Sequence, residues 1–136
     1  MLDIVKQHKS WNKHEVEACI STIVYAFNTL DIPFKTNIEL KFEKQSTQWS
    51  GLALQNSLKK YEVRLFHSPD IYDMIATVLH EMVHIKQFRA GELGYTPTLT
   101  WHDGTRCNDV EYDDQPWEKE AFKLEKKLVK KLLTKT

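Results

Sequence analysis

Two histidines and a glutamate stand close together in the middle of the chain, where residues 80–84 read His-Glu-Met-Val-His. On a helix, residues four apart lie about one turn apart on the same side, so His80 and His84 would reach one metal ion. This is the HExxH spacing of helical zinc sites. Glu81 follows at the adjacent angle, where it would act as a base on a metal-activated water without being a ligand. The segment therefore predicts a zinc site with hydrolytic chemistry.

The flanking residues predict the helix that this spacing needs. It is expected to begin near residue 69, with Ser68 as its cap and Pro69 at its first position. It should end near residue 89, because Gly91 follows. Apolar side chains form one stripe along it, with the histidines pointing roughly opposite: Ile71, Ile75, Val78, Met82 and Ile85.

A third metal ligand is expected downstream, because catalytic zinc usually has three protein ligands and one open position. Residues 116–121, Pro-Trp-Glu-Lys-Glu-Ala, place Glu118 and Glu120 at the start of a last helix. Either carboxylate would complete a set of two histidines and one glutamate. Acidic residues are also favoured in any first helical turn by the helix dipole, so both glutamates stay open.

A longer set of segments carries a family resemblance. They are the nine residues His-Glu-Met-Val-His-Ile-Lys-Gln-Phe from 80, Gly-Glu-Leu from 91, Trp-His-Asp-Gly from 101 and Pro-Trp-Glu-Lys-Glu-Ala from 116. Over about residues 71–125 the chain resembles the small SprT-like zinc metallopeptidases common in phage genomes. The resemblance implies a minimal zincin-like domain that uses Zn2+ to hydrolyse peptides or proteins.

The resemblance also bears on the third ligand. The chain is more distantly similar to gluzincins, whose third ligand is a glutamate directly before a small residue on a later helix, which implies Glu120. Spartan-type proteases share HExxH but use a later histidine before glycine, and here Asp103 separates His102 from Gly104. The expected ligands are His80, His84 and Glu120, with Glu118 and His102 as alternatives.

Peptide hydrolysis also needs a hydrogen-bond donor to the oxyanion of its tetrahedral intermediate. Four side chains are of a suitable type: Tyr95, His102, Arg106 and Tyr112. Their types alone favour none of them. Gln87 lies on the His80 side of the helix and would orient a neighbouring side chain.

The rest of the chain predicts the elements that hold the site. Residues 12–30 have the period of an amphipathic helix, and a last helix is expected from 114 to 132. Short alternating segments predict three strands of an antiparallel meander, at 38–42, 49–55 and 61–66. A further hairpin is expected within 98–110, around Asp103-Gly104. The expected fold class is α+β: an N-terminal helix, a small antiparallel sheet, the HExxH helix and a C-terminal helix.

Composition narrows the class of protein. With 136 residues, 41% hydrophobic and 28% charged, the chain fits a single domain over 1–136. Its 19 basic and 19 acidic residues balance, so no net field attracts nucleic acid or an anionic membrane. No apolar run is long enough to span a bilayer and no secretory signal is visible, which favours the cytoplasm, or the host cytoplasm for a phage protein. Two cysteines in that compartment are expected to be free thiols.

Two other functions fit the same residues. One is a catalytically silent zinc module, such as a phage protein that binds a host factor. The other is a DNA-associated, Spartan-like protease that binds DNA through the lysines of the last helix, although a solvated helix face is favoured for them. The intact Glu81 favours an enzyme, because a structural zinc site has four closed ligands and needs no base. Substrate would then add as a strand along a sheet edge, for which 49–55 is the expected strand.

Overall fold

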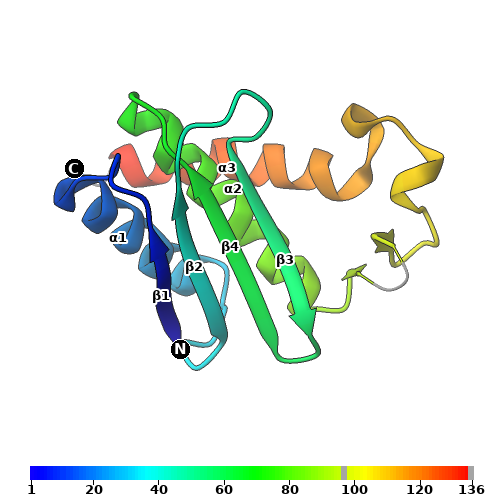
Figure 1. Ribbon diagram of the computed structural model, residues 1–136. Coiled ribbons are helices and arrows are strands. Elements are labelled where there is room, and N and C mark those ends of the chain that lie inside the picture. Colours follow the sequence, from blue (N-terminus) through cyan, green and yellow to red (C-terminus); the bar gives the residue numbers. More distant parts are fainter. Residues whose placement is uncertain (96–97, 135–136) are drawn as a thin grey trace.

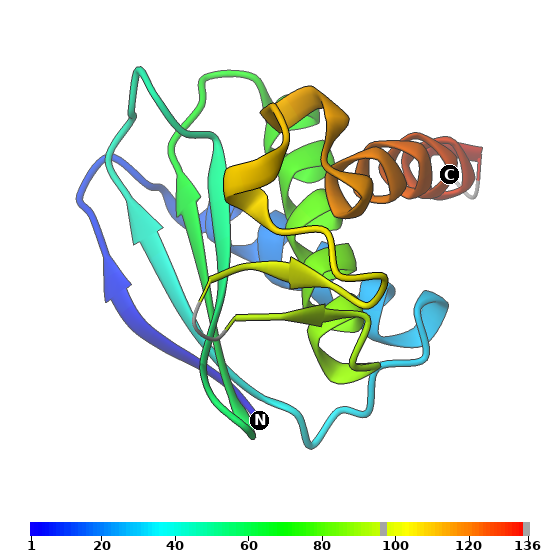
Figure 2. The ribbon, with the colours of Figure 1, turned by 90° about the vertical axis from the view of Figure 1, so that its right-hand side faces the viewer.

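The computed structural model describes residues 1–95 and 98–134. It holds one four-stranded sheet with three α-helices on a single face (Figures 1 and 2). The strands are β1 (Leu2–Gln7), β2 (Asn37–Glu43), β3 (Gly51–Ser57) and β4 (Lys60–Phe66). The helices are α1 (Lys13–Thr29), α2 (Ile71–Arg89) and α3 (Pro116–Thr134). The α+β class is therefore confirmed.

The sheet is mixed, which corrects the expected antiparallel meander. Its strand order is β1-β2-β4-β3, with β1 and β4 parallel to β2 and only β3 antiparallel to β4. The chain leaves β2, crosses to the far edge to form β3, and turns back through Leu58 and Lys59 into β4. Burial explains this order, because Val63 and Leu65 of β4 are fully buried whereas much of β3 is exposed. The more apolar strand takes the interior position.

Strand β1 was not expected from the sequence. It pairs with β2 along one edge of the sheet, and five of its six residues are exposed. A strand that buries so little carries almost no hydrophobic pattern. The connection from β1 through α1 to β2 is the crossover that parallel neighbours require.

Helix α2 begins at Ile71, two residues later than its predicted start at Pro69. Its N-cap is Asp70, whose side chain accepts hydrogen bonds from the backbone N–H groups of Tyr72 and Asp73. Ser68 instead accepts from the N–H of Asp70, and Pro69 lies before the helix. The carboxylate of Asp70 also suits the positive end of the helix dipole, which explains why it takes the cap position.

The second half of α2 is buried on nearly every side. Val78, Met82 and Ile85 are fully buried, as the predicted stripe requires, whereas Ile71 near the helix start is 38% exposed. His80, Glu81 and His84 on the other side are each only 6% exposed. The histidines are enclosed by α3, which packs against α2 from the side away from the sheet (Figure 2), and Glu81 is enclosed by β3.

The expected hairpin around Asp103-Gly104 forms only near its turn, where the N–H of Trp101 donates to the oxygen of Thr105 and that of Cys107 to the oxygen of Leu99. Strand β5 (Leu93–Gly94) pairs antiparallel with β6 (Thr100–Trp101), and only an isolated bridge joins Thr100 to Arg106. Two short 3-10 helices follow, at Cys107–Asp109 and Tyr112–Asp114. The Asp-Gly turn does form, with Gly104 at a φ of 94°, but the chain after it curls into these turns instead of a second strand.

One hydrophobic cluster joins the sheet, α1, α2 and α3. Trp117 is its largest fully buried side chain and seats the first turn of α3 against α2. None of the three α-helices described combines the length and the apolar composition needed to cross a membrane.

Candidate metal centre

Three buried side chains from two helices converge on one point. Ligand atoms of His80, His84 and Glu118 all lie within 4.8 Å of one another. The Nε2 atoms of His80 and His84 lie 2.8 and 3.3 Å from the same atom, Oε1 of Glu118. Two imidazole nitrogens and one carboxylate oxygen form a donor set suited to a divalent metal ion. The group can therefore hold a metal.

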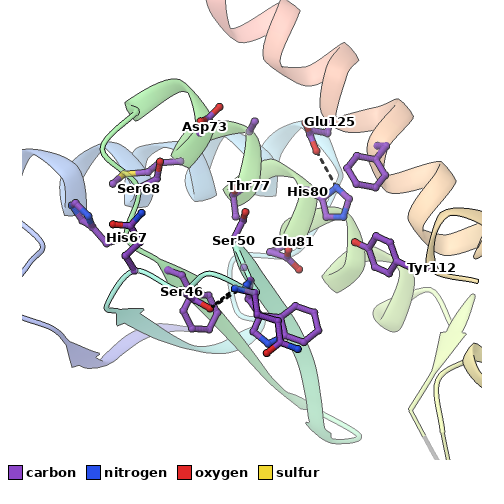
Figure 3. A pocket seen from close by; sticks show the side chains of 18 residues that line it. Ser46, Ser50, His67, Ser68, Asp73, Thr77, His80, Glu81, Tyr112 and Glu125 are labelled. Carbon is purple, nitrogen blue, oxygen red and sulfur yellow. Dashed lines mark hydrogen bonds and ion pairs between the residues drawn. The ribbon is translucent and has the colours of Figure 1, made fainter.

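The outer nitrogen of His80 is also engaged. Its Nδ1 donates to Oε1 of Glu125 at 3.0 Å, which is drawn as a dashed line in Figure 3. A carboxylate on the outer nitrogen of a ligating histidine fixes the ring orientation and makes the inner nitrogen a better ligand. Glu125 lies on the same face of α3 as Glu118, about two turns further along. The same helix therefore supplies both contacts to His80.

His84 is oriented by Gln87 in the same way. Its Nδ1 donates to Oε1 of Gln87 at 2.8 Å. The Nε2 of Gln87 then donates to the backbone oxygen of Trp117 and to Oε1 of Glu120, each at 3.0 Å. Gln87 is completely buried, and these bonds use its amide at both ends. It thereby ties the orientation of His84 to the first turn of α3, the turn that carries Glu118.

The structure places Glu118, the alternative, where the resemblance implied Glu120. The carboxylate of Glu120 accepts from Gln87 and lies 3.8 Å from the Nζ of Lys86, so it supports the site from outside the ligand group. His102 is exposed and packs beside Trp101, with ring centroids 4.8 Å apart and ring planes tilted by 45°, and it is not a member of the metal group.

Glu81 lies against the edge strand of the sheet. Gly51, the first residue of β3, has no side chain there, and a Cβ at Gly51 would lie 2.6 Å from Cγ2 of Thr77 and 3.0 Å from Cγ of Glu81. The close approach of strand and helix therefore requires glycine at this position. Figure 3 shows Glu81 and His80 facing the same hollow, with Ser46 and Ser50 of the β2–β3 loop across from them.

Opposite charges draw the three side chains of the group together. Burial opposes protonation of His80, but hydrogen bonds to Glu118 and Glu125 outweigh it and raise the pKa of His80 to about 10. Burial by itself would raise the pKa of the Glu118 carboxyl. Its hydrogen bonds to both histidines outweigh burial and lower that pKa to about 2.

The pKa of Glu81 shifts upward, opposite to that of Glu118. Its loss of water on burial raises its pKa, and the nearby negative charge of Glu118 adds to this, although His80 and His84 act against it. A carboxylate with a raised pKa is a better proton acceptor at neutral pH than an exposed one.

Of the four oxyanion donors expected by type, the structure brings Tyr112 to the metal group. Its hydroxyl donates to Oε1 of Glu118 at 3.1 Å, and its ring lines the cavities around His80 and Glu81. Arg106 is instead paired with Asp109 on the surface at 3.2 Å. Tyr95 is not among the residues that line these cavities.

Sequence reasoning missed Glu125 and Gly51, and it gave Gln87 only a general role. A signal for Glu125 exists, because residues seven apart share a helix face and Glu118 is seven residues before it.

Comparison of the chain with protein-family models, curated proteins and solved structures finds no match.

Proposed function

We propose that the chain is a zinc-dependent peptidase whose ligands are His80, His84 and Glu118 and whose base is Glu81. The observation that carries the proposal is the convergence of the three ligand atoms within 4.8 Å, directly beside the buried Glu81. A silent structural site would have no use for that carboxylate. Two histidines and one glutamate form a common ligand set of catalytic zinc, which is why zinc is chosen among divalent metals.

The division of labour follows from the positions of the side chains. A bound zinc ion would supply Lewis acidity, making a water nucleophilic and a peptide carbonyl electrophilic. Glu81, with its raised pKa, accepts the proton of the attacking water and returns it to the leaving amine. The hydroxyl of Tyr112, which donates to Glu118 in the structure, is the side-chain donor assigned to the developing oxyanion.

The sheet edge offers a place for the substrate backbone. Strand β3 is the edge of the sheet nearest the metal group, and Gly51 at its start meets Glu81. An extended peptide added along such an edge gains main-chain hydrogen bonds without any requirement on its own side chains. Its peptide bonds would then pass Glu81 one after another, which suits a hydrolase of peptides or unfolded protein segments.

The first experiment tests the ligands and the base separately. Metal content is measured by mass spectrometry on wild type, Glu118→Gln, Glu120→Gln and Glu81→Gln, all purified without chelators. Wild type, Glu120→Gln and Glu81→Gln should each hold about one zinc per chain, whereas Glu118→Gln should lose most of it. Glu120→Gln is the matched control, because it makes the same change two residues away. Zinc-free wild-type protein would refute the proposal.

Activity is then measured on a casein or peptide-library substrate. Glu81→Gln removes the proton acceptor and should lower kcat by roughly 10²- to 10⁴-fold while the zinc stays bound. Glu120→Gln should keep most of the activity. Equal activity in Glu81→Gln and wild type would show that Glu81 is not the base.

A further inference from the structure

Two cavities of different character meet at the metal group. The larger has a volume of about 760 Å³ and runs toward the β2–β3 loop and the first half of α2 (Figure 3). The smaller has a volume of about 270 Å³ and runs toward the end of α2 and Leu99. Both are lined by the same five residues at their junction: Trp49, Gly51, His80, Glu81 and Tyr112. A peptide lying along β3 would therefore place one side of its scissile bond in each.

The smaller cavity is apolar. Among the described residues, its ionisable lining side chains are Tyr112, the metal group and Glu81. Its other walls are mostly apolar: Leu52, Ala53, Leu54, Phe88, Leu93 and Leu99, with Trp49 and Trp117. Gln115 and the indole N–H of Trp117 add neutral polar groups but no charge. A charged group entering it would lose water without gaining a partner, which is costly.

The larger cavity is mixed in character, because Phe66, Met74 and Phe122 line it beside polar groups. It is lined by hydroxyl, amide and charged groups, including Ser46, Gln48, His67 and Asp73. The volume of the smaller cavity limits what it can bind. A cavity of 270 Å³ is slightly smaller than a typical small-molecule site, so it has room for one side chain and not for a length of peptide.

We infer that the smaller cavity is a specificity pocket that binds one large apolar side chain of the substrate, next to the bond that is cut. The inference rests on the proposed peptidase function and names its substrate class: peptides with leucine, phenylalanine or a similar residue at one of the two positions flanking the scissile bond. The larger, mixed cavity takes the other side without such a preference.

The inference is tested by cleavage of a proteome-derived peptide library, with the cleaved bonds read by mass spectrometry. One flanking position should be dominated by large apolar residues. In a cleaved peptide, replacing that leucine by alanine should lower kcat/KM roughly 10- to 200-fold, the range for lost methylene groups in an apolar pocket. Cleavage with no preference at either position would overturn the inference and leave the peptidase function intact.

Two variants change the pocket in different ways. Ala53 and Leu99 line it and are only partly buried, so both positions tolerate substitution better than its fully buried walls. Ala53→Phe fills the cavity and should shift the preference to small side chains. Leu99→Lys adds a cation and should make acidic residues acceptable. The control is Leu58→Lys, the same change at a leucine that is 84% exposed and lines neither cavity. An unchanged preference in both folded pocket variants would contradict the assignment.

A binding measurement separates failure of the pocket from failure of the enzyme. Zinc-loaded Glu81→Gln protein is titrated with N-acetyl-leucinamide and, separately, N-acetyl-aspartamide, and amide NMR shifts are followed at Ala53 and Leu99. Shifts with the leucine compound alone support the pocket, even if no peptide is cut and the peptidase proposal falls. Absence of a leucine-specific shift, together with no apolar preference in cleavage, overturns it.

Discussion

At the scale of single residues, each histidine of the metal group is held by a hydrogen-bond partner on its outer nitrogen. His80 is fixed by Glu125, and His84 is fixed by Gln87, so both inner nitrogens face Glu118. Outer partners of this kind typically change metal affinity 10- to 100-fold when they are removed. The geometry of the ligands is thus set before any metal arrives.

Gly51 gives the sharpest residue-scale prediction. Gly51→Ala adds a Cβ that would meet Cγ2 of Thr77 at 2.6 Å and displace the strand from Glu81. Activity should fall on the order of 100-fold, the usual result of a shift of about 1 Å at a reacting group, while zinc content stays near one per chain. The measurement is kcat/KM beside metal analysis.

A second substitution checks the cause of this effect. Thr77→Ser removes Cγ2, so the double variant Gly51→Ala/Thr77→Ser should recover a large part of the lost activity, and Thr77→Ser alone should be close to wild type. No recovery in the double variant would show that contact with Thr77 is not what excludes alanine.

At the scale of elements, the Asp70 cap stabilises the start of α2, the helix that carries both histidines. Asp70→Ala removes the cap that accepts from Tyr72 and Asp73 and should destabilise the protein by about 0.5 to 2 kcal/mol. Ser68→Ala is the comparison, because Ser68 accepts only a single bond before the helix. The measurement is urea unfolding followed by circular dichroism, and a larger loss for Ser68→Ala would contradict the assigned cap.

The elements also show which parts of the site a sequence can reveal. His80, Glu81 and His84 were predictable because the helical repeat fixes their relative directions locally. Glu118 and Glu120 lie about 200° apart around α3, on opposite flanks of its apolar stripe. Which flank meets α2 depends on how two helices distant in sequence are rotated against each other. That rotation is set by Trp117 and Gln87, whose contacts are not local.

The sheet was harder to predict for a related reason. Alternation identified the residues of β2 and β4, but pairing between strands is not encoded in the period of either. Only the two-residue turn at Leu58 and Lys59 ties β3 to β4 locally. The parallel pairing of β2 with β4 depends on their shared buried face.

At the scale of the whole molecule, a metal ion would link α2 to α3 and should stabilise the complete fold. Ligand binding to the native state alone adds about 4 kcal/mol at 1,000 times Kd. Removal of zinc by a chelator should therefore lower Tm clearly, and readdition of zinc should restore it. The measurement is differential scanning calorimetry.

Two controls make the thermal result specific. Magnesium prefers six oxygen ligands and should not restore the Tm. Glu118→Gln should show little response to zinc, whereas Glu120→Gln should respond like wild type. A zinc response in Glu118→Gln equal to that of wild type would place the metal elsewhere.

The division of the ligands between α2 and α3 also has a consequence for synthesis of the chain. During translation α2 emerges with both histidines and Glu81, but Glu118, Glu125 and the contact of Gln87 with Trp117 all await α3. A nascent chain that ends before α3 has no complete metal group. The site is therefore assembled only after nearly the whole described fold has left the ribosome, so maturation of the centre is coupled to completion of the domain.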